Sequence, residues 1–161
     1  MKFTYRAEYP VAPEAVFAVM REQSFQDAKC DATTTGRWSA DITSAGDRTV
    51  ITTERLLPTE GLPDIARSFV GDTLTVIEVQ TWGSPAADGS RTADLNLHVK
   101  GAPMTLKGSI RLSPTATGSR QEVEADLRAG VPLIGGKLEK AAAEPLLAAA
   151  RTETTLLRDR L

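Results

Sequence analysis

Cysteine and histidine are almost missing from this chain, since Cys30 and His98 are each the only residue of their kind among 161. One thiol cannot form a disulfide within the chain or a cysteine-based zinc site, and such a chain fits a reducing compartment. A Ser-His-Asp triad or a histidine metal site would depend on His98, whose place in a strand pattern predicts that it faces solvent. We therefore interpret Cys30 as a small buried apolar residue and expect no metal ion.

An excess of one charge is missing as well. The chain has 19 basic and 21 acidic residues, a formal net charge of -2, and no block of like charges. We therefore expect no nucleic acid and no anionic membrane as partner. No apolar run is long enough to cross a bilayer, and the start MKFTYRAEYP lacks the pattern of a secretory leader. These absences predict a cytoplasmic protein without integral membrane contact.

What the chain does have is alternation of apolar and polar residues. Phe3, Tyr5 and Ala7 alternate with polar residues, which is typical of a strand with one buried face. Pro13 suits the first turn of a helix over residues 13–20, and a second short helical piece carries Phe25. Six further strands are predicted over residues 37–44, 48–57, 72–82, 93–99, 104–112 and 121–128. Their close spacing and Gly or Pro turns favour an antiparallel meander.

The last 31 residues, from Val131 to Leu161, form the only long run with helical periodicity. The predicted apolar stripe of this helix consists of Ile134, Leu138, Ala141, Pro145, Ala149, Thr152 and Leu156. Many of these side chains are small, so the helix either approaches the sheet closely or leaves space beneath it. Because the sheet is apolar on one face only, this helix is the element that we expect to cover it.

This order of elements resembles the helix-grip fold of the START, pollen-allergen and polyketide-cyclase superfamily (SRPBCC). The segments FTYRAEYPVAPEAVFAVM, FVGDTLTVIEVQTW and VPLIGGKLEK are similar to an uncharacterised bacterial domain-of-unknown-function family within it. The resemblance implies one α+β domain over residues 1–161. In this fold a curved seven-stranded antiparallel sheet wraps the C-terminal helix around an apolar cavity, and two short helices follow the first strand. It implies no particular substrate, because carriers, receptors and cyclases share this architecture.

Two motifs bear on chemistry. The segment GVPLIGGK resembles a phosphate-binding loop only superficially, because Gly136 displaces the lysine and Leu138 stands where a hydroxyl is needed, so we expect no nucleotide and no other cofactor. The other candidate is Glu78, where the strand alternation is ambiguous. If Glu78 faces an apolar cavity, its pKa is raised and it can act as an acid or base. If Ile77 and Val79 take the inner side instead, Glu78 is solvated, and we favour this second interpretation.

The sequence favours a protein that binds a hydrophobic or amphipathic small molecule, such as a lipid or polyketide-like compound, without transforming it. The predicted ligand-binding residues are Ile65, Phe69, Leu95, Leu97, Leu106, Ile110, Leu138 and Ala142. The segment from Leu62 to Gly71 is either a movable lid over this cavity or a plug at one end of the core. The alternatives are a cyclase, aromatase or hydrolase that uses Glu78, Tyr5 or Tyr9, and an interaction module with a filled core. Neither the ligand nor the oligomeric state is set by these residues.

Overall fold

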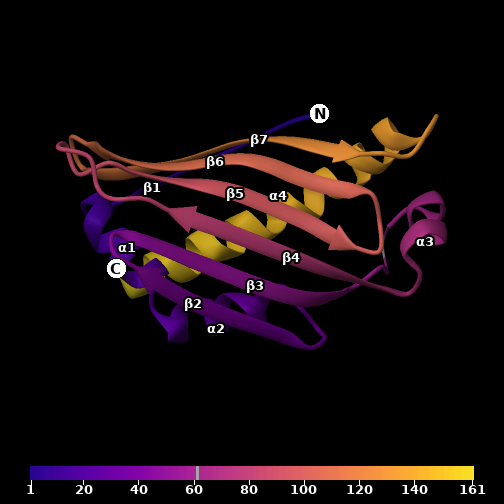
Figure 1. The fold of residues 1–161 in the computed structure, drawn as a ribbon, viewed down its shortest axis with the longest axis horizontal. Helices are drawn as coiled ribbons and strands as arrows, with labels where there is room; N and C mark the ends of the chain where they lie inside the picture. The colour runs from indigo at the N-terminus through magenta and orange to yellow at the C-terminus, as the bar shows by residue number, and fades with distance from the viewer. Residues whose placement is uncertain (61) are drawn as a thin grey trace.

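Seven antiparallel strands form one sheet in the computed structural model, which describes residues 1–60 and 62–161. The strand order is β1-β7-β6-β5-β4-β3-β2, so the strands from β2 to β7 follow one another as a meander and β1 pairs with β7 (Figure 1). The strands are β1 (Lys2–Tyr9), β2 (Trp38–Ala45), β3 (Arg48–Pro58), β4 (Thr73–Trp82), β5 (Arg91–Lys100), β6 (Met104–Thr115) and β7 (Gly118–Ala129). The predicted antiparallel meander is confirmed.

One face of the sheet is buried and the other is exposed, as the alternation predicted. Along β5, Ala93, Leu95, Leu97 and Val99 are buried, whereas Asp94 between them is exposed. The buried face is covered by α4 (Gly135–Arg160), which runs across the sheet on its far side in Figure 1. The arrangement of a curved sheet around a long C-terminal helix is therefore confirmed.

The predicted stripe holds in the first half of α4, where Leu138 is buried, but the covering face is rotated from it in the second half, where Thr154 and Leu157 are buried. The helix continues through Pro145, which is exposed, while Leu146 is partly buried beside it. The fully buried residues of α4 are Leu138, Thr154 and Leu157. In the second half of α4 periodicity placed the stripe wrongly because small residues lie on both sides of it, so the two faces differ little in hydrophobicity.

Three shorter helices complete the fold. Helices α1 (Pro13–Met20) and α2 (Gln23–Thr33) follow β1 and contact α4, and they bury Phe17 and Phe25 respectively. Helix α3 (Asp64–Val70) connects β3 to β4 and lies at the end of the sheet opposite to α1 (Figure 1). The helical turn predicted in this segment is confirmed, and it brings α3 beside the start of α4.

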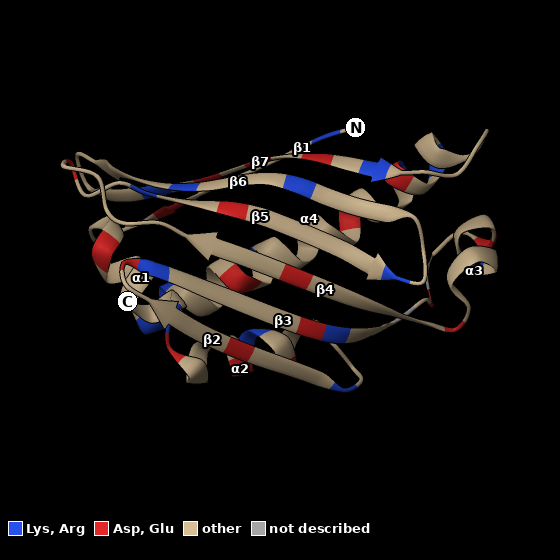
Figure 2. Cartoon of the chain, in the orientation of Figure 1, with Lys and Arg blue, Asp and Glu red and all other residues tan. Residues whose placement is uncertain are grey.

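Charged residues are interspersed along the sheet and the helices, with both signs on neighbouring elements (Figure 2). Within residues 1–60 and 62–161, no helix combines the length and the apolar character that crossing a membrane requires. Four charged side chains, those of Lys29, Arg55, Glu78 and Glu153, lie on the buried side of the sheet.

Candidate functional site

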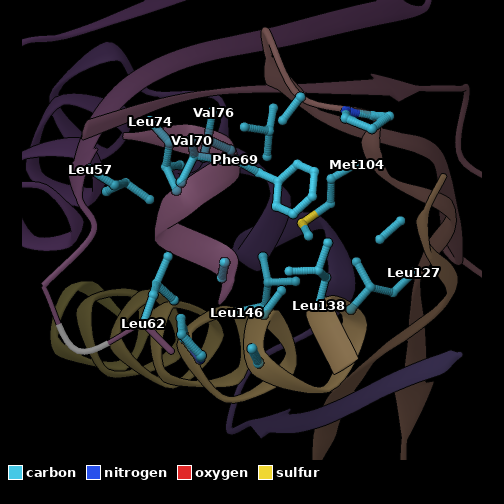
Figure 3. Close-up of a pocket in the computed structure, with 18 of the residues that line it drawn as sticks. Leu57, Leu62, Phe69, Val70, Leu74, Val76, Met104, Leu127, Leu138 and Leu146 are labelled. Atoms are coloured by element: carbon cyan, nitrogen blue, oxygen red, sulfur yellow. The ribbon is translucent and has the colours of Figure 1, made fainter. Parts of the chain in front are cut away.

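An apolar cavity of about 110 Å³ lies between the buried face of the sheet, α3 and the first half of α4. Apolar side chains of the sheet, α3 and α4 line it, together with apolar residues of loops such as Ala102 and Pro103. In Figure 3 the ring of Phe69 from α3 points into the space bounded by Met104, Leu138 and Leu146. The lining residues are Leu57, Leu62, Ala66, Phe69, Val70, Leu74, Val76, Leu97, Val99, Ala102, Pro103, Met104, Leu127, Ala129, Val131, Leu138, Ala141, Ala142, Pro145 and Leu146.

Four of the predicted ligand-binding residues, Phe69, Leu97, Leu138 and Ala142, line this apolar cavity. Three others, Leu95, Leu106 and Ile110, line a second cavity farther along the sheet, to which Leu97 also contributes.

Ile65 lines neither cavity, so the geometry does not support its predicted role. Helix α3 turns Ala66, Phe69 and Val70 toward the apolar cavity, at spacings of three and four residues. Ile65 precedes Ala66 by one residue, which rotates its side chain by about 100° around the helix axis. The prediction took the apolar residues of α3 as one face, whereas only part of that face reaches the cavity.

The second cavity has a volume of about 70 Å³ and contains charged side chains. Lys29 of α2 lies between two carboxylates, with its Nζ 3.0 Å from Glu78 Oε1 and 3.3 Å from Glu153 Oε2. Arg55 of β3 donates from Nη2 to Glu78 Oε2 at 2.8 Å. Together these four residues are the buried ion cluster. It joins β3, β4, α2 and α4 at one point, so its geometry is held by four separate elements.

Neutral side chains extend the network around the buried ion cluster. Gln80 donates from Nε2 to Glu78 Oε1 at 2.7 Å, and Trp82 donates from Nε1 to Gln80 Oε1 at 3.0 Å. On the other side, Arg55 Nη1 donates to Thr33 Oγ1 at 2.9 Å. The Glu78 carboxylate therefore accepts hydrogen bonds from three donors and is fixed in position.

The position of Glu78 contradicts the interpretation that the sequence favoured, in which Glu78 is solvated. Its side chain faces inward, in the same register as Val76 and Gln80, and is 9% exposed instead of solvated. Burial by itself would raise the pKa of Glu78, but Lys29 and Arg55 outweigh that effect and lower the pKa to about 2. The alternative of a raised pKa is also wrong, because the cavity around Glu78 is not apolar. A carboxylate with so low a pKa is a weak base.

Lys29 is held in its charged form by the same contacts. Burial would lower the pKa of Lys29, but the charges of Glu153 and Glu78 outweigh that effect and raise the pKa above its ordinary value. The other candidate acids lie nearby. Tyr5 OH shares a hydrogen bond of 2.8 Å with Thr154 Oγ1, and burial raises the pKa of Tyr9. The site therefore combines the charged side chains of the buried ion cluster with nearby tyrosine and threonine hydroxyl groups.

Sequence reasoning missed Lys29, Arg55 and Glu153, although two of them had a signal. Arg55 has the strand parity of Ile51 and Thr53, which are buried, so the alternation of β3 predicts an inward arginine. Lys29 follows Phe25 at the spacing that shares a helix face. Glu153 had no comparable signal because the stripe of α4 was placed wrongly. The part of the chain that is described contains no group of three or more His, Cys, Asp or Glu residues able to hold a metal ion.

A groove of about 410 Å³ leads from the surface toward both cavities. It runs between the end of α2 and the small residues of α4, where Thr35 and Ala148 are exposed. The second cavity, which contains the buried ion cluster, is called the polar cavity from here on. Arg55 and Leu146 line both this groove and the polar cavity, and Leu57 lines both the groove and the apolar cavity. The small side chains of α4 thus leave space beside the helix, as one of the two sequence alternatives stated.

Comparison with known proteins gives a family and a fold. The sequence matches the family described as "Protein of unknown function (DUF2505)" over residues 4–161. An uncharacterized protein of Mycobacterium tuberculosis H37Rv is 28% identical over 146 residues, which is 86% of this chain and 83% of the relative. An uncharacterized protein of Mycobacterium bovis has the same identity and coverage.

Among solved structures, a STAR-related lipid transfer protein of Xanthomonas axonopodis aligns with a TM-score of 0.61 and 14% identity, over 99% of this chain and 84% of that chain. A protein of Thermus thermophilus, TTHA0849, aligns with a TM-score of 0.62 and 12% identity, over 99% and 96% of the two chains. The Zhui aromatase/cyclase of Streptomyces aligns with a TM-score of 0.50 and 12% identity, over 97% and 87%. These likenesses confirm the helix-grip fold.

Proposed function

This chain belongs to the family described as "Protein of unknown function (DUF2505)", and we propose that it binds a hydrophobic or amphipathic small molecule in the apolar cavity beneath α3 and α4. The observation that carries the proposal is the lining of that cavity, which is apolar from the sheet, from α3 and from α4 alike. Such a surface favours hydrocarbon over water. The lipid transfer and aromatase/cyclase proteins of the same fold support this class of ligand, such as a lipid or polyketide-like compound.

The volume of the apolar cavity determines how large an apolar group can bind without a rearrangement of the protein. At roughly 24 cal/mol per Å³, leaving 110 Å³ empty costs about 3 kcal/mol, so occupation by an apolar group stabilises the fold. A dry engineered cavity of about 150 Å³ binds benzene. The apolar cavity is smaller than that, so it accommodates a few methylene groups as it stands, and a ring or a longer ligand requires α3 to move outward.

Helix α3 is suited to such a movement. It has seven residues, only Ala66 among them is buried, and the ring of Phe69 points inward although that residue is 45% exposed. Short elements with few buried contacts open at low free energy. We therefore treat α3 as a lid over the apolar cavity.

Binding is favoured over catalysis because Glu78, the candidate acid or base named from the sequence, is ionised and held by two cations. Proton transfer to or from a substrate would require breaking these buried contacts, which costs several kcal/mol. A general base needs a pKa closer to the working pH than about 2.

Thermal shift with a library of alkylbenzenes, medium-chain fatty acids and aromatic polyketides tests the proposal. At about 100 times the dissociation constant, a ligand should add roughly 2.7 kcal/mol, or about 5 to 11 °C in Tm for a chain of this length. Leu138→Trp, which fills the apolar cavity, should reduce the shift. Leu133→Trp is the matched control, because Leu133 is fully exposed.

Native mass spectrometry of freshly purified protein is the second measurement, and it should show a co-purified apolar molecule that is absent from Leu138→Trp. If no compound shifts Tm, no ligand co-purifies, and both Trp variants fold normally, the binding proposal is wrong. An interaction module would then be the better interpretation.

A further inference from the structure

The exposed face of the sheet has two halves of different chemistry. On β5, β6, β7 and β1 the side chains that point outward are polar, and many of them are charged. Some of these charges pair across neighbouring strands, as Lys2 does with Asp126 and Arg6 with Glu122. This half of the face is therefore typical of an antiparallel sheet in contact with water.

On β3 and β4 most of the outward positions carry apolar or β-branched residues instead. In β4 Ile77 and Val79 point outward and are half-buried, whereas Glu78 between them points inward. The outer patch is the group formed by these two residues and the uncharged outward residues beside them on the two strands: Val50, Thr52, Leu56, Thr75, Ile77, Val79 and Thr81.

The outer patch has the composition of a covered surface. A strand with one face in water has polar residues on that face, whereas a strand covered on both faces is apolar on both. β4 has the second pattern at Ile77 and Val79. Within residues 1–60 and 62–161 no helix covers these side chains, because the helices lie on the opposite face of the sheet or at its end (Figure 1).

Charged residues border the outer patch in a definite order. On β5, Asp94 lies opposite Thr81 and Lys100 lies opposite Thr75. Both charged side chains are exposed. One end of the outer patch is therefore negative along this border, and the other end is positive.

The border on β2 repeats this order. Arg37, which precedes β2 and bonds to β3 through its backbone oxygen, lies in line with Lys100 across the sheet, and Asp41 lies opposite Thr52, nearer to Asp94. In the part of the chain that the structure describes, none of these four charged side chains takes part in an ion pair. They are therefore available to a second molecule with the complementary order of charges.

We propose that the outer patch is the interface of a dimer, in which two copies of this chain stack their sheets face to face with the strands running in opposite directions. A two-fold axis across the strands places each strand over its own counterpart and reverses its direction. Lys100 of each copy then lies over Asp94 of the other, and the positive end of each outer patch meets a negative end. The side chains of stacked sheets interdigitate, so Ile77 and Val79 are removed from water at the centre.

The dimensions of this interface predict a weak dimer. The four strands from β2 to β5, about 4.8 Å apart and about eight residues long, cover roughly 19 by 27 Å, or about 500 Å² on each copy. The total of about 1,000 Å² is at the low end for specific interfaces. Glu54 of β3 also points outward, and removing its charge from water weakens the contact further. We therefore expect a dissociation constant in the micromolar range.

Sedimentation velocity of the whole chain, from low micromolar to millimolar concentration, tests the inference. We expect the sedimentation coefficient to rise from that of a monomer to that of a dimer across this range. Ile77→Lys places a charge at the centre of the outer patch and should weaken the dimer at least about tenfold. Ser109→Lys is the matched control, because it adds the same charge at an exposed outward position of β6, beyond the outer patch. Val79→Lys replaces Ile77→Lys if circular dichroism shows that the latter does not fold.

A charge exchange tests the direction of the strands. Asp94→Lys and Lys100→Asp should each weaken the dimer at least about threefold, because each creates two like-charged contacts across the two-fold axis. The double variant restores opposite charges at both contacts and should regain most of the affinity of the wild type. Restoration is not expected if the two residues act separately.

Three outcomes would overturn the inference. The first is a wild type that stays monomeric up to millimolar concentration, and the second is a dimer that Ile77→Lys and Val79→Lys leave intact or that Ser109→Lys weakens equally. The third is a charge exchange that does not restore the dimer. The proposed function stands in each case, because both cavities lie on the opposite face of the sheet and the thermal shift measurement tests them separately.

Discussion

Replacing Glu78 with glutamine removes the central anion of the buried ion cluster while keeping nearly the same shape. Lys29 and Arg55 are 2% and 4% exposed; Lys29 would keep Glu153 as its carboxylate partner, whereas Arg55 would lose the carboxylate that it contacts. Removing one partner of a buried ion pair costs about 3 to 5 kcal/mol, because the remaining charge stays buried without compensation. We therefore expect Glu78→Gln to lose about that much unfolding free energy at pH 7.

The same carboxylate makes stability depend on pH. The pKa of Glu78 is about 2 in the folded chain and 4.5 without the fold's influence. Because the folded pKa is the lower one, the contribution to stability is fully present above about pH 4.5 and is lost as the pH falls through about 2. At 1.36 kcal/mol per pKa unit, this difference amounts to about 3 kcal/mol in the wild type. Glu78→Gln has no proton to take up at this position, so it should lack this part of the acid dependence.

Urea unfolding at several pH values between 7 and 2 measures both effects. The gap between the wild type and Glu78→Gln should be largest at pH 7 and should narrow by about 3 kcal/mol as the pH approaches 2. Glu8→Gln is the control, because Glu8 pairs with Arg120 at the exposed edge of the sheet and should change stability little. A Glu78→Gln curve that runs parallel to the wild type at all pH values would refute the assignment of Glu78 to a tightly held pair.

Three further predictions address other parts of the chain. Cys30 is fully buried, and burial raises the pKa of its thiol. We therefore expect no reaction with Ellman's reagent at pH 8 until urea unfolds the chain. Rapid reaction of the folded protein would contradict this. Amides of residues 66–70 in α3 should exchange hydrogen faster than those of residues 95–99 in β5, and equal rates would mean a plug instead of a lid. Gly108→Ala should cost about 1 to 3 kcal/mol in thermal unfolding, because its Cβ would lie 2.0 Å from the carbonyl oxygen of Glu124. Gly136→Ala, which meets nothing within 4 Å, is its control and should be neutral or stabilising.

The fold could be predicted from the sequence because its strands have one buried and one exposed face. Where polar and apolar residues alternate without exception, as along β5, parity alone gave the correct inner face. The helices could be predicted as elements, because Pro13 marks the start of the first and helical spacing marks the last, although the last begins at Gly135 instead of Val131. In α4 the prediction succeeded for the element and failed for its face, since alanine gives little contrast between an inner and an outer side.

The candidate site was predictable only in its apolar part. Glu78 lies in β4, where Ile77 and Val79 compete with Val76 for the inner side, and hydrophobicity favoured the wrong alternative. A buried carboxylate becomes stable only if cations are placed around it. Those cations, Lys29 and Arg55, come from 49 and 23 residues away in sequence. No local pattern reports such a pairing, although an inward arginine at Arg55 would have suggested an inward carboxylate nearby.

The pairing of β1 with β7 has a consequence for how the chain folds. Phe3 lies opposite Ala125 and Tyr9 lies opposite Ser119, so β1 can find its partner only after the chain through β7 has been made. Helix α4, which shields the apolar face of the sheet, is made later still. Contacts between such distant parts slow folding, and the strands between them expose apolar surface in the meantime. The same meander that creates the cavity therefore leaves its apolar face uncovered until α4 has been made.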